Sequence, residues 1–274
     1  MGKNLDISLF FQYKLQRYYK MRCYYMKWGS FGPVHITSLV IAALLVVALY
    51  FALKKASRRV QITVLGVLSF AGICAVIFDM VTWNSPIEYL PLHLCSLNAL
   101  VLPFAVFTRN KALNNLLLVW SLGAIAALVV NTAQAEYELM SKVFFFYFFP
   151  HVTEFGIPIL MFKLGLVKKD IRCIGSTMGI TLGTYTVIHF INLWLNAYCI
   201  ENQILDWAGN IVQVNYMYSL VPVNPVFQLF WSVIPQPYWY MLMAFPLILV
   251  YLLIVYSGQL RELIRSWKHK EVKE

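Results

Sequence analysis

Polar and ionisable side chains lie within the long apolar stretches of this 274-residue chain. Such a group is costly in hydrocarbon, so it usually has a polar partner or a function. Cys95 is the candidate nucleophile and His151 its candidate base, because a thiol becomes reactive only when a base or a positive neighbour generates the thiolate. Glu154 follows His151 by three residues. In a helix it would share a face with the imidazole and could orient it.

Other polar residues are candidates for substrate binding or for stabilising a developing oxyanion. His93, Asn192 and Asn215 are the expected hydrogen-bond donors. The wider set adds His35, His189, Tyr216, Asp79 and Asn131. No CxxC, HxxxH or HExxH spacing occurs, so we expect no metal ion and no other cofactor. A zinc site formed by His93, His151 and His189 is the less favoured alternative.

Each candidate also has a purely structural interpretation. A single Cys in a membrane helix mostly behaves as a small apolar residue. A His or Asn in a membrane more often hydrogen-bonds a neighbouring helix than takes part in chemistry. Residue types and spacing alone therefore predict only a polar pocket in a helical bundle.

The elements that position these residues are predicted to be membrane-spanning helices. The chain is 60% hydrophobic and 12% charged, and its mean hydropathy is +0.66. A run of about 20 apolar residues spans a bilayer as a helix. The sequence predicts an all-α, polytopic bundle of about seven such helices, near 34–53, 61–83, 90–107, 114–133, 143–163, 174–199 and 238–257.

Charges in the connecting loops predict the orientation of this bundle. Basic residues concentrate at 54–59, 109–111, 163–172 and 261–273, whereas the opposite loops contain only Lys142. The positive-inside rule makes the first set cytoplasmic. The N-terminus would then lie outside a cell membrane and the C-terminus inside, with the candidate residues toward the outer half. The net charge of +10 is consistent with lipid headgroups rather than with nucleic acid as the partner.

Three regions are expected along the chain. Residues 1–32 mix aromatic side chains with six basic ones and are predicted to form an amphipathic helix in the membrane interface. Residues 33–257 form the transmembrane domain, and 258–274 form a basic cytoplasmic tail. The loop 200–237 contains four prolines and no basic residue. We expect it to form a short helix or a re-entrant cap. The sequence gives no indication of the oligomeric state.

One motif resembles a known family. The stretch Leu90-Pro-Leu-His-Leu-Cys-Ser96 is similar to a signature of the YwaF-like bacterial integral membrane proteins. The resemblance extends over about residues 30–257. Its other landmarks match in order, namely Pro33-Val-His35, Phe149-Pro-His151, Asn192, Asn215-Tyr-Met217 and Pro237-Tyr-Trp-Tyr240.

That family is in turn similar to eukaryotic transmembrane acyltransferases that remodel ether glycerophospholipids. The resemblance implies an intramembrane acyltransferase with a Cys95–His151 dyad, a thioester intermediate and membrane phospholipid as its partner. Residues 123–135, in the predicted fourth span, depart from the family pattern. This departure weakens the inference of the substrate more than the inference of the fold. A lipid hydrolase, a small-substrate or proton-coupled transporter and a non-catalytic scaffold or sensor are the alternatives.

Overall fold

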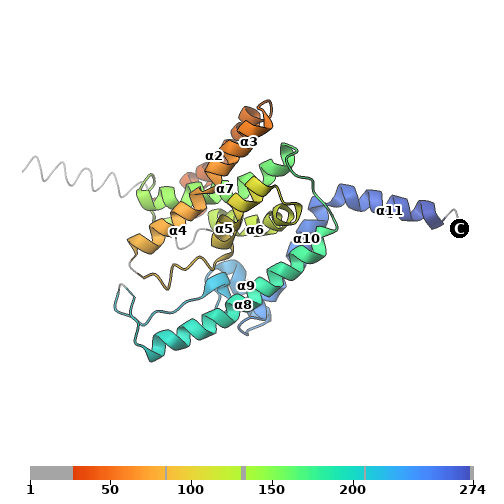
Figure 1. Cartoon of the computed structure of the whole chain (residues 1–274). Helices are drawn as coiled ribbons and strands as arrows, with labels where there is room; N and C mark the ends of the chain where they lie inside the picture. Colours follow the sequence, from red (N-terminus) through yellow and green to blue (C-terminus); the bar gives the residue numbers. More distant parts are fainter. Residues whose placement is uncertain (1–26, 84, 131–133, 207, 272–274) are drawn as a thin grey trace, which may run out of the picture.

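The computed structural model is a bundle of helices (Figure 1). It describes residues 27–83, 85–130, 134–206 and 208–271, and within them it has helices and short 3₁₀ turns but no strand. The predicted all-α class is therefore confirmed. Five lengths of helix in this part of the chain are long and apolar enough to cross a membrane. They are α2 (Pro33–Leu53), the consecutive α3 (Arg58–Ser69) and α4 (Ala71–Thr82), α6 (Lys111–Val129), α7 (Lys142–Lys163) and α8 (Cys173–Glu201).

The other two predicted spans differ from single long helices. Helix α5 (Leu94–Thr108) has 15 residues, which is about 22 Å and short of the roughly 30 Å hydrocarbon core. It begins later than predicted because residues 85–93 form turns and bends. The last predicted span divides into η3 (Tyr240–Met243), α10 (Ala244–Val255) and α11 (Ser257–Glu271), with a bend of 72° before α11. By length, the described helices supply five or six spans instead of seven.

The terminal regions and the predicted cap differ in how much of each the structure describes. Most of the predicted interfacial helix, residues 1–26, lies outside the described residues. The end of that segment packs into the bundle, where Trp28 is fully buried and its indole N–H donates to Ser38 Oγ at 2.7 Å. The predicted cap at 200–237 contains η2 (Tyr216–Tyr218) and the short helix α9 (Pro225–Val233). Most of the predicted tail lies in α11.

Helices α5, α6 and α7 form the centre of the bundle, with buried Leu102, Leu117 and Met161 in one apolar cluster. Helix α4 packs closely against this centre at Gly72. A Cβ atom there would lie 2.5 Å from Ala99 Cβ and 2.6 Å from Glu154 Oε1. The missing side chain therefore allows three helices to meet.

Replacing Gly72 with alanine should lower the free energy of unfolding by about 1–3 kcal/mol, because the added methyl group overpacks this junction. Thermal unfolding in detergent measures the effect. Gly175→Ala is the matched control, since a Cβ at this helical position meets no atom within 4 Å. If both substitutions left the melting temperature unchanged, the close approach of α4 would be wrong.

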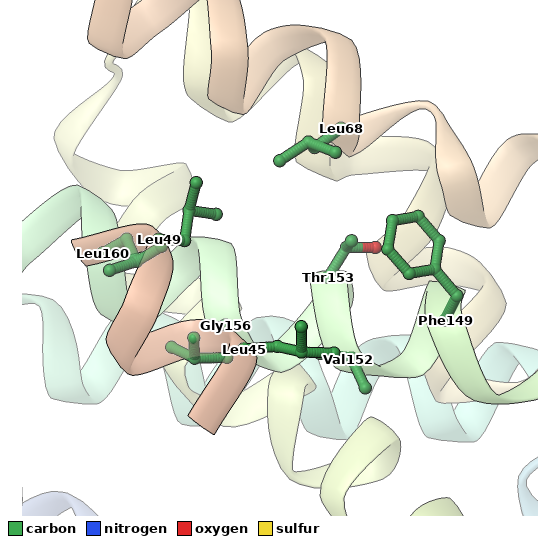
Figure 2. A pocket seen from close by; sticks show the side chains of 9 residues that line it. Leu45, Leu49, Leu68, Phe149, Val152, Thr153, Gly156 and Leu160 are labelled. Carbon is green, nitrogen blue, oxygen red and sulfur yellow. The ribbon is translucent and has the colours of Figure 1, made fainter. Parts of the chain in front are cut away.

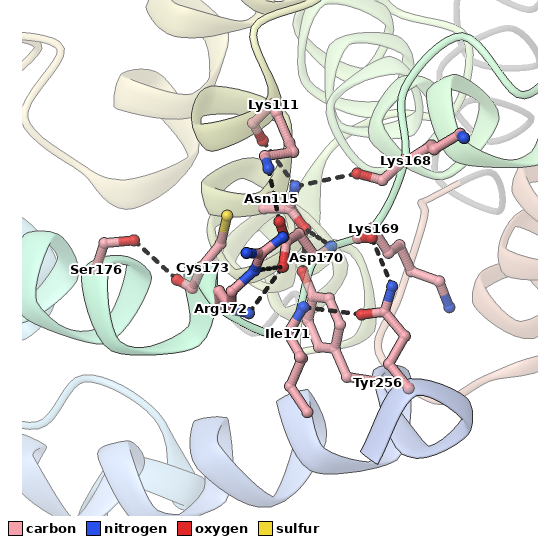
Figure 3. A network of polar contacts seen from close by, with 11 residues as sticks. Lys111, Asn115, Lys168, Lys169, Asp170, Ile171, Arg172, Cys173, Ser176 and Tyr256 are labelled. Carbon is pink, nitrogen blue, oxygen red and sulfur yellow. Dashed lines mark hydrogen bonds and ion pairs between the residues drawn. The ribbon is translucent and has the colours of Figure 1, made fainter. Parts of the chain in front are cut away.

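A polar network fixes the end of the bundle where α6, α10 and the loop before α8 meet (Figure 3). The Lys111 ammonium donates to Asp170 Oδ2 at 2.6 Å, and the Asp170 backbone N–H donates to Asn115 Oδ1 at 3.1 Å. The Tyr256 hydroxyl also donates to Asn115 Oδ1. These bonds join the loop to α6 and to the end of α10.

The network predicts an acid-sensitive contribution to stability. The Lys111 ammonium is the main cause that lowers the pKa of Asp170 from 3.8 to about 2. A carboxylate with a depressed pKa stabilises the fold above its unfolded-state pKa, and this contribution is lost as the pH falls through the folded-state value. Asp170→Asn should therefore flatten the dependence of the melting temperature on pH between about 4 and 2. An unchanged dependence would show that the ion pair contributes nothing.

Candidate functional site

A cavity of about 300 Å³ lies among α5, α6, α8, α10 and the segment containing η2 and α9. Its walls are mostly apolar. Gly123, Ala126 and Ala127 of α6 leave room on one side, and Phe227 of α9, Phe245 and Ile248 enclose another. Polar side chains also reach it, among them His93, Cys95, Tyr147 and Tyr218. The cavity therefore combines space for an apolar ligand with a cysteine thiol.

Cys95 lies at the beginning of α5. His93 has extended backbone angles and precedes the first helical residue, Leu94, so Cys95 is in the first turn. The N–H groups of a first turn have no intrahelical acceptor, and a helix N-terminus favours negative charge. Backbone N–H groups at such a helix end can stabilise an oxyanion that forms beside the sulfur.

Helices α5 and α7 pack against each other beside this site. Asn98, three residues after Cys95, donates through Nδ2 to the backbone oxygen of Glu154 at 3.0 Å, and Glu154 is three residues after His151. Residues three apart share a helix face. Among the described residues, helix α6 is the one α-helix between α5 and α7 in the chain. Helices α5 and α7 therefore cross the bundle in the same direction. Cys95 and His151 are therefore at similar depth on neighbouring helices.

His151 does not line the cavity itself, but its ring contacts that of Tyr147, which does. The two rings pack with their centroids 4.4 Å apart. Tyr147 and Cys95 both line the cavity. No hydrogen bond joins Cys95 to His151 in the part of the chain that the structure describes. Tyr147 therefore lies between the cavity that contains Cys95 and the ring of His151.

Hydrogen bonds assign different tautomers to the two histidines. His151 Nδ1 is 2.6 Å from the backbone oxygen of Tyr147. A carbonyl oxygen can only accept, so Nδ1 carries the proton and Nε2 of the neutral ring has the free lone pair. His93 Nδ1 instead accepts from the Met217 backbone N–H at 3.4 Å, which leaves the proton on Nε2. Nε2 therefore has the free lone pair in His151 and carries the proton in His93.

Glu154 occupies a different place from the one predicted. The expected role was to orient His151, but the Tyr147 backbone oxygen takes that position. Glu154 is buried where α4, α5 and α7 meet, with Oε1 close to Gly72. Its Oε2 has no hydrogen-bond partner among the described residues. The side chain contributes to this helix junction rather than to the dyad.

Asn192, Tyr216 and Asn215 support the cavity wall. Asn192 donates to the Tyr216 backbone oxygen at 2.8 Å and accepts from the Tyr216 backbone N–H at 2.9 Å. Asn215 Oδ1 accepts from the Leu220 backbone N–H at 3.0 Å. Asn192 and Asn215 were predicted as oxyanion donors. Instead, their amides hold the turn at η2.

His189 and His35 bond to protein groups away from the cavity. His189 Nδ1 lies 3.1 Å from Ser219 Oγ, which also accepts from Asn192. His35 is fully buried, and its two ring nitrogens bond to the Phe31 N–H at 2.9 Å and the Leu128 oxygen at 2.8 Å. Both histidines therefore join segments of the bundle.

The remaining sequence candidates do not meet at the cavity. Asp79, near the end of α4, is not one of the lining residues. Asn131 lies outside the described residues. In the described part of the chain, no three His, Cys, Asp or Glu side chains form a group that could hold a metal ion. The alternative zinc site thus has no geometric support.

Sequence reasoning missed Tyr147, Tyr218 and Gly123. Tyr147 could have been found, because it lies four residues before His151 and so on the same helix face. Gly123 and Tyr218 gave no local signal. They reach the site through the packing of α6 and the fold of a distant loop.

A second cavity, of about 180 Å³, lies where α2, α3 and α7 meet (Figure 2). Leu45, Leu68, Phe149 and Leu160 are among its apolar walls. The Thr153 hydroxyl, the polar side chain on the wall, donates to the Pro150 oxygen of its own helix at 2.8 Å. This cavity therefore offers space for apolar groups but no reactive group.

The fold and the site define a multi-pass helical membrane protein with a thiol-bearing internal cavity. The chain belongs to the TMEM164 family, whose model matches residues 30–255. No curated protein and no solved structure matches the chain.

Proposed function

We propose that this protein is an intramembrane acyltransferase that moves an acyl chain between glycerophospholipids through a thioester on Cys95. The observation that carries the proposal is the position of Cys95, in the first turn of α5 and on the wall of a largely apolar cavity. The resemblance of the Leu90–Ser96 motif to the YwaF-like proteins, which are in turn similar to transmembrane acyltransferases, supports the same chemistry. The cell membrane and its lipids would supply both substrates.

The first half-reaction requires His151 to approach Cys95 once lipid is bound. His151 Nε2 then takes the thiol proton, and the Cys95 sulfur attacks the ester carbonyl carbon. The bond between this carbon and the glycerol oxygen breaks, and the leaving oxygen receives the proton from His151. The lysophospholipid product leaves, and the acyl group stays on the sulfur. In the second half, His151 accepts a proton from the hydroxyl of an acceptor lysophospholipid as that oxygen attacks the thioester. The sulfur then regains a proton from the imidazolium.

The small side chains of α6 should select the acyl group. Ala126 lines the cavity and lies in the stretch that departs from the family pattern. Ala126→Leu should reduce transfer of long acyl chains about tenfold relative to short ones, because the added carbons occupy the space of the chain. Competition between a short-chain and a long-chain donor measures the ratio. An unchanged ratio would place the acyl chain elsewhere.

Acyl exchange in proteoliposomes tests the proposed function. The donor is a phosphatidylcholine with a deuterated acyl chain, and the acceptor is a lysophosphatidylethanolamine. We expect lipid mass spectrometry to find the deuterated chain on the acceptor with wild type and with Cys74→Ala, an exposed thiol on α4. Cys95→Ala should give no exchange.

Two other results would overturn the acyltransferase proposal. Deuterated free fatty acid without acylated acceptor would identify a lipid hydrolase. Unchanged donor with the wild-type protein would exclude both acyl-transfer activities and favour the transporter or scaffold interpretation.

A further inference from the structure

Tyr218 has an unusual backbone on the cavity wall. Its φ is 55°, and that of Met217 before it is 50°. Positive φ is uncommon for bulky residues and persists only where the surrounding structure enforces it. Asn192 and Asn215 supply that enforcement through their bonds to the loop backbone. The loop thus holds Tyr218 against the cavity in a conformation that the local sequence does not favour.

The Tyr218 side chain packs beside His93 on the wall of the cavity. Its ring centroid is 5.3 Å from that of His93 and 5.0 Å from that of Phe227. Cys95 lines the same cavity. The side chain therefore faces the space into which the Cys95 thiol and the His93 ring also open.

The Tyr218 hydroxyl is distinguished from the other tyrosine hydroxyls of the cavity. Tyr147 donates to the Ala127 oxygen at 2.8 Å, and Tyr185 donates to the Tyr238 oxygen at 2.8 Å. No described residue forms a hydrogen bond with the Tyr218 hydroxyl. Tyr218 therefore presents a free donor at the site.

We propose that Tyr218 is a catalytic residue that donates its hydroxyl hydrogen bond to the carbonyl oxygen of the acyl ester as it becomes an oxyanion. This role rests on the proposed function. The proton stays on the phenol oxygen throughout, and the oxyanion collapses when the bond to the glycerol oxygen breaks. A donor fixed before the reaction stabilises the transition state without reorganisation, and removing one such donor costs about 10²–10³ in rate.

Single-turnover acylation of Cys95 tests this role. Purified protein in vesicles is mixed with a defined phosphatidylcholine, quenched with acid at intervals and weighed intact. Tyr218→Phe retains the ring and removes one oxygen. Tyr251→Phe is the matched control, because its hydroxyl donates to the Leu118 oxygen at 3.1 Å on α6 and the residue does not line the cavity.

Tyr218→Phe should acylate about 10²–10³-fold more slowly than wild type, whereas Tyr251→Phe should match wild type. Equal acylation rates in wild type and Tyr218→Phe would overturn the role of Tyr218 and leave the proposed function intact. Absence of the adduct in wild type would reject the thioester mechanism, and the role of Tyr218 with it.

Helix α11 carries a separate inference, independent of the catalytic proposal. It follows Val255, where the family match ends, and bends 72° from the spanning direction of α10. Gln259 stabilises this bend between α10 and α11. Its Oε1 accepts from the Ile171 N–H at 2.8 Å, and its Nε2 donates to the Lys169 oxygen at 2.7 Å. A helix held at that angle to a transmembrane helix runs along the membrane surface. Figure 1 shows α11 extending away from the bundle.

The described part of α11 is amphipathic. Leu260, Leu263 and Ile264 have the spacing of one helix face, while Arg261 and Arg265 lie four residues apart. Leu263 and Ile264 are 39% and 46% exposed, so the bundle does not cover this apolar face. Apolar side chains beside cations match the acyl–headgroup boundary of an anionic membrane.

We infer that α11 is an interfacial helix that binds anionic phospholipid headgroups on the surface of the membrane that the bundle spans. Hydrogen exchange of the full chain in nanodiscs tests this. Amides 257–266 should exchange at least about tenfold more slowly in phosphatidylcholine–phosphatidylglycerol discs than in phosphatidylcholine discs. Arg261→Gln with Arg265→Gln should remove the difference, whereas Arg58→Gln on α3 should retain it. Equal exchange in both discs, or an unchanged difference in the double variant, would overturn the inference.

Discussion

Cys95→Ser is expected to reduce acyl exchange at least about 10³-fold, because removing the nucleophile of a cooperating set eliminates most of its catalysis. Serine is close in size, but its hydroxyl is a far weaker acid than a thiol and forms its anion less readily. The substitution leaves the packing of α5 nearly unchanged, so the melting temperature should stay close to that of wild type. The initial rate of acyl exchange in proteoliposomes measures the loss.

Cys74→Ser controls for the general effect of removing a thiol, because Cys74 is exposed on α4. It should keep the wild-type rate. Retention of activity within tenfold in Cys95→Ser would mean that another group attacks the ester.

His151→Gln is expected to lower the rate of Cys95 acylation by about 10²–10⁴, since the amide cannot accept the thiol proton. The substitution should leave lipid binding intact, because His151 does not line the cavity. The two assigned tautomers predict a smaller loss for His93→Gln, whose amide can still donate to the oxyanion. Quenched single-turnover measurements compare the two variants.

The order of these effects discriminates between the histidines. A greater loss in His93→Gln than in His151→Gln would assign the base to His93. It would also contradict the assignment based on the Tyr147 carbonyl, whose bond to His151 Nδ1 leaves Nε2 as the acceptor.

Much of the fold could be predicted from hydropathy. Each predicted apolar run has a helical counterpart, because backbone polar groups in hydrocarbon must be satisfied within the segment. The start of α5 could not be placed this way, since apolar composition does not distinguish the turns at 85–93 from a first helical turn. The bend after α10 was also missed, because bonds from Gln259 to a loop about 90 residues earlier stabilise it.

Part of the candidate site could be predicted from residue types and short motifs. Cys95 and His151 follow from residue type and from motifs, and the structure places them on neighbouring helices in register. Glu154 shows the limit of this reasoning: its spacing suits a partner of His151, yet the backbone oxygen of Tyr147 takes that bond. Tyr218 reaches the cavity through a backbone with positive φ that the amides of Asn192 and Asn215 support. No pattern within its own segment indicates such a conformation.

The most direct measurement is the intact mass of the wild-type protein after incubation with mixed phospholipids. We expect a mass increase equal to one acyl group, removable by hydroxylamine, located on Cys95 by peptide mapping and lost in Cys95→Ala. An unmodified mass in wild type, in samples quenched during turnover and with acceptor lipid omitted, would contradict a thioester mechanism.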